Sequence, residues 1–498
     1  MSSPPYLPLF LLSSLATILL TYRSNSSSAS STAAAPPGFA SFQKLYLAAY
    51  LCMVAGDWMQ GPYVYALYDS YGFSQQAIAV LFVAGFGSSM IFGTVVGSFA
   101  DKLGRKKFAL VYVAAYIMSC LTKHFNSFPV LLLGRFLGGI STSLLFSVFD
   151  AWMINEHNSR GFDPALLSDT FTKAIFTNSV VAIASGLVAN AAASLSPLAR
   201  FSSEGSLTKP FQAAFTAGDG SIMMGGFCAP FDLAIAILLV GGSIIFHYWG
   251  ENYGARSDSS GGEAESFSAI KNGIAAVKND EKILLCGLIS SLFEGSMYAF
   301  VFMWTPALQG AGASGGHRLL SGDDGDDEGL PFGLIFATFM VCCMAGSSVF
   351  GIFVKTMQVQ DIGTKAFLIA AAALFVPVIT ADTTFIFLAF LVFEFTVGLY
   401  FPTMGTLKSS IVPEKMRSTI YNIYRIPLNV IVLTVLLTSM SISTTFLCCS
   451  VMLAVAAYCQ NRLSLLLASE KPVGEDLEAG GEREVMLGAV DDEFKGED

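Results

Sequence analysis

The sequence contains few charged residues for its length. Asp, Glu, Lys and Arg make up only 13% of its 498 residues, whereas soluble domains usually contain about 25%. Hydrophobic residues make up 53% of the same chain. This composition excludes an ordinary soluble globular domain and indicates a helical membrane protein with several spans.

Signatures of metal, redox, nucleotide and catalytic chemistry are also absent from the sequence. The nine cysteines include no C-x-x-C pair and behave as small apolar residues rather than metal ligands or a disulfide framework. The sequence contains no G-x-x-x-x-G-K-[ST] loop for a nucleotide and no convergent nucleophile and base. The four histidines lie at span ends or in loops, where solvated side chains are expected: His124, His157, His247 and His317. We therefore expect no enzyme, no metal site, no cofactor and no use of ATP.

The net charge of −10 comes largely from the C-terminal tail. From Glu470 onward there are 11 acidic residues against only three basic ones. We expect this tail to be disordered and solvated, and its charge gives no reason to expect a nucleic-acid partner.

Hydrophobic stretches of at least about 18 residues, which can cross a hydrocarbon layer about 30 Å thick, recur along the chain. The expected fold class is therefore an all-α membrane protein. Twelve transmembrane helices are predicted, at residues 40–66, 75–99, 107–124, 129–154, 169–192, 229–249, 281–306, 331–354, 365–381, 384–407, 417–440 and 443–467.

Basic residues are unequally divided between alternate loops. The loops that follow even-numbered spans carry 14 Lys and Arg residues, and those that follow odd-numbered spans carry four. Since cytoplasmic loops are enriched in Lys and Arg, the first set and both ends of the twelve-span core are predicted to be cytoplasmic.

A further hydrophobic segment precedes the core at residues 6–22. It lacks the basic start of a cleaved signal peptide, although its Ser-rich surroundings leave an organellar transit sequence as an alternative. We favour an extra membrane helix whose N-terminus lies outside and whose end is held inside by Arg23.

The expected organisation has five parts. Residues 1–38 form the N-terminal hydrophobic segment and a Ser/Ala-rich linker, and residues 39–250 form the N-terminal six-helix half. Residues 251–280 form a polar cytoplasmic linker, residues 281–468 the C-terminal six-helix half, and residues 469–498 the acidic tail. Two six-span halves around a cytoplasmic linker are typical of secondary transporters.

The loop after span two reads GSFADKLGRKK, residues 97–107. It resembles the G-x-x-x-D-[RK]-x-G-R-[RK]-[RK] signature of the major facilitator superfamily and lies between two predicted spans. The resemblance implies a cytoplasmic gate that stabilises the outward-facing state, although these charges alternatively serve only to set topology. The gate residues are Gly97, Asp101, Gly104 and Arg105 of the motif, with Glu156 and Arg160 as partner charges from span four.

Longer stretches narrow the resemblance. DWMQGPYVYALY, LLLGRFLGGISTSLLFSVFDAWMINEH, YWGENY, FEGSMYAFVFMWTPAL, GLYFPTM and YRIPLN together resemble the molybdate-anion transporter family, also called major facilitator domain-containing protein 5. The similarity extends from about residue 40 to residue 465 of the sequence. It implies the major facilitator fold and uptake of molybdate across a cell membrane.

Four carboxylates lie in predicted spans one, four, seven and ten, which line the central cavity if the superfamily resemblance holds. They are Asp57, Asp150, Glu294 and Glu394. Carboxylates removed from water favour their protonated form, so at least one is a candidate for proton coupling. The alternative is structural pairing between helices, with Arg135 of span four as one partner. Arg135 resembles the superfamily's span-four arginine and is itself a candidate for coupling or gating, with substrate binding as the alternative.

Two cations occupy matching places in spans five and eleven. Lys173 and Arg425 each lie some residues past the inner end of their span, and the internal repeat would set them across the cavity from each other. Two opposed cations with amide donors suit a tetrahedral dianion, so the predicted substrate-binding residues are Lys173, Asn422, Arg425 and Asn429. Alternatively, Lys173 reaches the interface or pairs with Asp169 one turn away.

We therefore predict a secondary active transporter that takes up molybdate by alternating access, with proton coupling as an option. Sulfate, a sugar or an organic anion remain alternative cargoes, and a non-transporting membrane sensor is a second alternative. The expected partners are an oxyanion and the lipid bilayer. The plasma membrane is the favoured location and an organellar membrane is the alternative, while the oligomeric state is left open.

Overall fold

The computed structural model describes residues 5–25, 36–93, 96–200, 220–254, 263–314, 330–413, 416–438 and 440–469. Twelve helices in this part of the chain are long and apolar enough to cross a membrane. They comprise an N-terminal helix and eleven of the twelve predicted core spans. The remaining span is α6, whose first residues are the cations Arg105, Lys106 and Lys107, and it packs between α7 and α11.

The N-terminal half contains one short strand pair among its helices. Its elements are α2 (Phe39–Trp58), η1 (Gly61–Tyr63), α3 (Val64–Ser70), α4 (Gln75–Gly93), α5 (Val96–Leu103), α6 (Arg105–Thr122), α7 (Phe128–Leu145), α8 (Val148–Ser159), α9 (Pro164–Ser194), β1 (Ala199–Arg200), β2 (Met223–Met224), η2 (Gly226–Cys228) and α11 (Ala229–Tyr248). The two strands are antiparallel and pair Ala199 with Met224.

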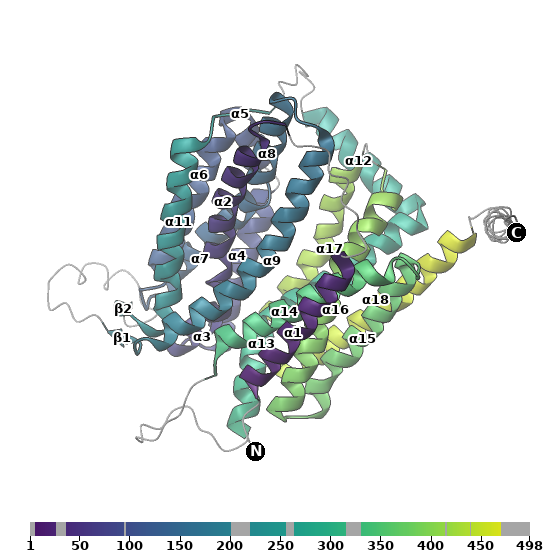
Figure 1. Cartoon of the computed structure of the whole chain (residues 1–498). Helices are drawn as coiled ribbons and strands as arrows, with labels where there is room; N and C mark the ends of the chain where they lie inside the picture. The colour runs from purple at the N-terminus through teal and green to yellow at the C-terminus, as the bar shows by residue number, and fades with distance from the viewer. Residues whose placement is uncertain are drawn as a thin grey trace, which may run out of the picture.

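The C-terminal half follows the linker helix α12 (Glu263–Asn279). Its helices are α13 (Glu281–Ser314), α14 (Phe332–Phe353), α15 (Val359–Ile379), α16 (Thr383–Ile411), α17 (Arg417–Leu437) and α18 (Ile442–Ser469). The two groups of helices are inclined to one another (Figure 1). The two six-helix groups agree with the all-α organisation in two halves that the sequence predicts.

Two predicted spans are interrupted. Span one breaks after α2 into η1 and α3, where Pro62 cannot donate a backbone hydrogen bond. Span four divides into α7 and α8 at Phe146 and Ser147. At this break the Ser147 hydroxyl donates a hydrogen bond to the backbone oxygen of Ser143 at 2.7 Å. Such local bonding competes with the helical ladder.

The predicted extra helix is present as α1 (Tyr6–Asn25), which lies along α14 of the C-terminal half (Figure 1). Thr17 Oγ1 donates to Val341 O at 3.2 Å, and Thr21 Oγ1 lies 2.9 Å from Ser348 Oγ. The opposite side of α1 exposes apolar side chains such as Leu11, Leu15 and Ile18. The helix therefore directs hydroxyls at α14 and an apolar surface outward, as expected for a lipid-facing helix.

The two halves are joined at their outer ends. One hydrophobic core runs through the C-terminal half and continues into Tyr63, Tyr68 and Phe82 of the N-terminal half, and a separate core fills the inner part of that half. Tyr63 bridges the halves, since its hydroxyl donates to Asn190 Oδ1 and accepts the Gly333 N–H, each at 3.3 Å. The outer ends of the two halves are therefore in direct contact.

Candidate functional site

The centre of the C-terminal half contains an ion pair between α13 and α16. Lys408 Nζ lies 3.4 Å from Glu294 Oε1, and the Tyr400 hydroxyl donates to the same oxygen at 2.6 Å. Both charged side chains are about one-quarter exposed or less, at 21% for Lys408 and 24% for Glu294. A partly buried carboxylate with both a cation and a hydroxyl on one oxygen can exchange its partners when another charged group arrives.

Arg425 on α17 faces the junction between the two halves. Its Nη1 atom lies 3.9 Å from the position that a Cβ atom on Gly93 of α4 would occupy, and Ser143 Oγ of α7 lies 3.6 Å from that same position. On its other side, Arg425 is within electrostatic range of the Tyr298 hydroxyl, as is Glu294. Because Gly93 has no side chain, space remains between the Arg425 guanidinium group of the C-terminal half and the Ser143 hydroxyl of the N-terminal half.

Arg425 is exposed and makes no ion pair with any side chain in the described part of the chain. Pro427 lies inside the same helix, where its ring removes one backbone donor. Asn429 is half-buried on α17. The side chain of Asn422 lies outside the described residues, so its role in substrate binding stays a prediction.

Lys173 has a different environment from Arg425. Its Nζ atom lies 2.7 Å from Asp169 Oδ2 and 3.2 Å from Gln43 Oε1, and Gln43 also donates to that Asp169 oxygen at 3.1 Å. Lys173 thus has the Asp169 partner that helical spacing offered as an alternative, and its place opposite Arg425 stays a prediction. An acidic residue one turn away neutralises Lys173, while no such residue precedes Arg425 on α17.

The four predicted carboxylates have different surroundings. Asp57 accepts a hydrogen bond from the Tyr116 hydroxyl and lies within electrostatic range of Arg135. Asp150 is exposed and accepts the Tyr46 hydroxyl at 3.3 Å. Each of these two groups belongs to the N-terminal half and has a tyrosine partner.

Glu394 lies apart from Glu294, although both belong to the C-terminal half. Its side chain is only 6% exposed and sits near Cys342 and Cys343 of α14. The helix α16 packs against α14, and the expectation that Glu394 lines the central cavity stays a prediction. Arg135, in turn, donates from Nε to Leu81 O at 3.2 Å and covers the ring of Phe82, with its Cζ 4.8 Å from the ring centre.

The gate motif folds into a compact cluster at the inner end of the N-terminal half. Arg105 donates from Nε to Asp101 Oδ1 at 2.8 Å and from Nη1 to Ala151 O at 3.0 Å. Gly104 has a φ of 115°, a conformation that favours glycine. Gly97 has open space where a side chain would be.

Glu156 and Arg160 do not join this cluster through any described bond. They pair with each other, with Arg160 Nη2 lying 2.7 Å from Glu156 Oε1 one turn away. Besides Ala151 O of α8, the motif's hydrogen-bond partners come from the segment that follows α11. Glu251 accepts the Lys106 N–H at 2.8 Å, and Asn252 O accepts the Arg105 N–H at 3.0 Å.

Sequence reasoning missed Lys408 and Glu251. Lys408 was assigned to a cytoplasmic loop because span ten was predicted to end at 407, whereas α16 continues to Ile411. Tyr400 and Lys408 are about two helical turns apart, and this spacing could have indicated that both lie on one face of a longer helix. Glu251 lies in the stretch YWGENY, which marked the family resemblance without suggesting a helix cap.

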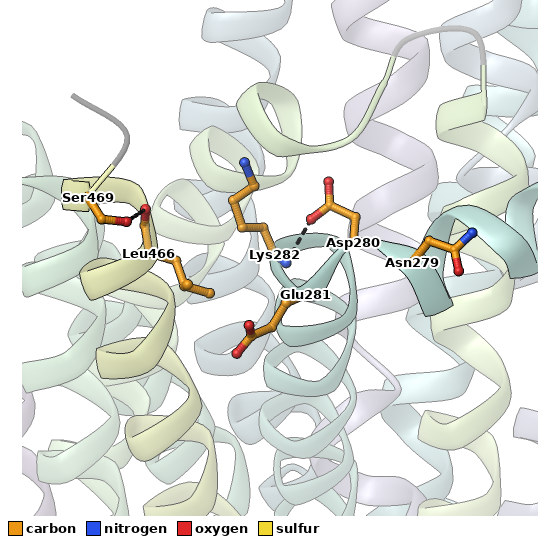
Figure 2. Close-up of a pocket in the computed structure, with 6 residues that line it drawn as sticks. All are labelled: Asn279, Asp280, Glu281, Lys282, Leu466 and Ser469. Atoms are coloured by element: carbon orange, nitrogen blue, oxygen red, sulfur yellow. Dashed lines mark hydrogen bonds between the residues drawn. The ribbon is translucent and has the colours of Figure 1, made fainter. Parts of the chain in front are cut away.

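The surface cavities of the described chain lie elsewhere. One of about 320 Å³ is lined by Asn279, Asp280, Glu281, Lys282, Leu466 and Ser469 (Figure 2). There Asp280 Oδ1 accepts the Lys282 N–H at 2.8 Å and caps α13. Another, of about 390 Å³, lies between the outer ends of α13 and α15. Neither cavity contains the charged groups of the centre.

Comparisons with known proteins agree with this architecture. The family described as sugar transporters with 12 transmembrane segments matches residues 7–217 and 211–390. A molybdate-anion transporter of Xenopus tropicalis is 33% identical over 407 residues, which cover 79% of this chain and 78% of the frog protein. One of Danio rerio is 31% identical over 437 residues, covering 82% of this chain and 81% of the fish protein.

Solved structures give the same fold at low sequence identity. The nucleoside transporter NupG aligns with a TM-score of 0.61 at 9% identity, covering 85% of this chain and 99% of its own. The xylose transporter XylE from E. coli, in an inward-open conformation, aligns with a TM-score of 0.57 at 12% identity, covering 85% of this chain and 96% of its own.

Proposed function

This chain belongs to the molybdate-anion transporter family of the major facilitator superfamily, and from that membership and its central charges we propose that it takes up molybdate by alternating access. The protein is a multi-pass membrane transporter and not an enzyme. Uptake from outside the cell makes the plasma membrane its proposed location.

The observation that supports the proposal most directly is that the Arg425 guanidinium group, at the junction of the halves, has no ion-pair partner in the described chain. Lys173, Lys408, Arg105 and Arg160 each have a carboxylate partner, whereas Arg425 has none among the described residues. Arg425 instead adjoins Gly93 and the Ser143 hydroxyl. A guanidinium group offers several donors in a plane that matches an oxyanion, so we assign Arg425 as the main substrate-binding residue.

Lys408 is proposed as a second cation for the dianion. Its ammonium group is held by Glu294 at 3.4 Å, and a doubly negative substrate would compete with that carboxylate. Protonation of Glu294 would release Lys408 towards the substrate, and loss of the proton would recapture it. This exchange would couple anion binding to a proton, with Asp57, Asp150 and Glu394 as less direct candidates.

Lys173 has a smaller proposed part than Arg425. It must leave Asp169 and Gln43 before it can bind an anion. Asn429, one turn beyond Arg425 on α17, and Asn422 remain proposed amide donors to the oxyanion.

Alternating access is supported by the two ends of the molecule. At the outer end, Gly186 of α9 and Gly333 of α14 approach so closely that a Cβ atom on Gly186 would lie 2.8 Å from Gly333 O. At the inner end, the Asp101–Arg105 pair is held within the N-terminal half. We propose that this inner cluster meets the C-terminal half when the outer contact opens.

The decisive experiment measures uptake of labelled molybdate into cells that lack their own system, with pH and excess sulfate varied. Saturable uptake that resists excess sulfate supports molybdate, whereas equal competition makes the cargo a general tetrahedral oxyanion. A neutral sugar is disfavoured because the central guanidinium would lose water without gaining an opposite charge. Proteoliposomes that move neither anion would overturn the proposal and favour the sensor.

A further inference from the structure

A second unpartnered cation is buried at the outer end of the N-terminal half. Lys123 ends α6 and is only 1% exposed, and its Nζ atom has no hydrogen-bond partner among the described residues. Lys123 is one of the four basic residues that the sequence places on the outer side of the core. Its burial instead removes a flexible ammonium group from water, which is costly without an opposite charge.

A phenol, a second cation and a nearby hydroxyl surround Lys123, and each of them can donate a hydrogen bond. Its Nζ atom lies 5.6 Å from the ring centre of Tyr68, whose hydroxyl is also buried and unpartnered in the described chain. Arg135 acts electrostatically on both Lys123 and Tyr68. Ser127, which follows in the loop, has a buried hydroxyl that also lacks a described partner. Two cations and two hydroxyls therefore occur in one region.

The nearby carboxylates are already engaged. Asp232 lies 3.0 Å from His124 Nε2, and Asp57 accepts the Tyr116 hydroxyl and acts on Arg135. Neither carboxylate forms an ion pair with Lys123 in the described chain. The buried Lys123 ammonium group therefore lacks a direct counter-charge there.

We propose that this region binds a small inorganic anion, held by the Lys123 ammonium group with the Tyr68 hydroxyl as a second donor and Arg135 as the neighbouring positive charge. Charge-assisted hydrogen bonds from an ammonium and a phenol suit such an anion. The site lies at the outer end of α6, beneath the segment in which the Met223 N–H donates to His124 O at 2.7 Å. Anions of the external medium would therefore supply it.

This outer anion site is separate from the central one. Lys123 ends α6 on the outer side, whereas Arg425 lies two turns into α17 from its inner end. The outer site lies within the N-terminal half, so it does not depend on movement between the halves. The inference of an outer anion site therefore does not depend on molybdate being the cargo.

The test uses the full-length Arg425→Ala protein, in which the central site is disabled. Thermal unfolding of the purified protein is followed in sodium gluconate while chloride or molybdate replaces gluconate at constant ionic strength. We expect saturable stabilisation by at least one of these anions. Loss of a charged donor should raise the apparent Kd about tenfold or more in Lys123→Met, and loss of one hydroxyl should raise it a few-fold in Tyr68→Phe.

The control is Lys44→Met, which removes an exposed lysine from α2 and should leave the anion response unchanged. Stabilisation by chloride alone identifies a halide site, and stabilisation by molybdate identifies a second site for the oxyanion. An absence of response to both anions, or an unchanged response in Lys123→Met, overturns the inference. Tyr68→Phe, which preserves the ring, decides the matter if Lys123→Met does not fold.

Discussion

The ammonium group of Lys408 lies 3.4 Å from a carboxylate oxygen of Glu294 and joins α16 to α13 on the face that Arg425 also approaches. The C-terminal half therefore contributes two cations and one carboxylate to the centre. With two cations and one ionised carboxylate the local charge is +1, so a bound dianion would be neutralised only if Glu294 took up a proton. Glu294 is therefore the carboxylate at which we would test the proposed proton coupling first.

Glu294→Gln should flatten the pH dependence of molybdate uptake. Glutamine keeps the size of the side chain and a hydrogen bond with Tyr400, but it cannot exchange a proton or hold the charge of Lys408. Uptake rates measured from acidic to neutral pH should vary less than about twofold, compared with the larger variation expected of a proton-coupled carrier. Glu281→Gln, which removes a surface carboxylate paired with Arg462, is the control. An unaltered profile in Glu294→Gln would remove this residue from coupling.

Arg425→Ala should abolish most molybdate uptake while surface expression stays normal. A hydrogen bond to a charged group contributes about 1.5–3 kcal/mol, so the loss of one guanidinium should lower uptake about tenfold or more. Arg425→Lys keeps the charge but not the planar donors and should be intermediate. The matched control is Arg462→Ala, since Arg462 is also in the C-terminal half but forms a half-exposed surface pair. Unchanged kinetics in Arg425→Ala would refute the site.

The central residues show which features a sequence can predict. Hydrophobic length and the motif at 97–107 are local properties, so the spans and the superfamily follow from the chain itself. Arg425 stands out because a cation in an apolar helix is rare. The partners of a charge are different: Lys173 could be assigned to Asp169 by helical spacing, but the Glu294–Lys408 pair depends on how α13 packs against α16. Helix ends are equally dependent on packing, which is why Lys408 was placed outside its helix.

Gly333→Ala should hold the outer end open. A Cβ atom on Gly333 would lie against Gly186 O and 2.8 Å from Asn190 N, so α9 and α14 could not close as they do here. Substrate uptake should fall, while a membrane-impermeant thiol reagent added outside should label Phe336→Cys more rapidly. Phe336 faces Trp58 across the junction at 5.9 Å between ring centres. Gly87→Ala is the control, because nothing lies within 4 Å of a Cβ atom there. Equal labelling in both backgrounds would contradict a gate at Gly333.

Gly104→Ala should be far more damaging than Gly97→Ala, although both glycines belong to the same motif. At Gly104 the φ of 115° is unfavourable for alanine, and a Cβ atom would lie 2.5 Å from the Glu251 carboxyl carbon. Such backbone strain costs about 1–3 kcal/mol, and the displaced Glu251 would release the start of α6. Thermal unfolding in detergent should show a lower Tm for Gly104→Ala and little change for Gly97→Ala. Similar Tm values would mean that the motif's second glycine has no structural requirement.

Tyr424 is expected to position Arg425, the next residue of α17. Its hydroxyl donates to Ile283 O at 2.6 Å, its carbonyl accepts Ser291 Oγ at 2.9 Å, and its ring occupies the space left by Gly287. These contacts fasten α17 to α13 one turn before Pro427 interrupts the helical hydrogen bonds.

Gly287→Ala should therefore raise the KM for molybdate while changing the maximal rate less, because a Cβ atom would displace the Tyr424 ring. Tyr424→Phe removes one hydrogen bond, worth about 1 kcal/mol, and should have a smaller effect in the same direction. Residues that act through one contact are not additive, so Gly287→Ala combined with Tyr424→Phe should exceed Gly287→Ala alone only slightly. Gly405→Ala, at an open position on α16, is the control. Additive changes in KM would mean that Gly287 and Tyr424 act separately, and that Arg425 is held in place by other contacts.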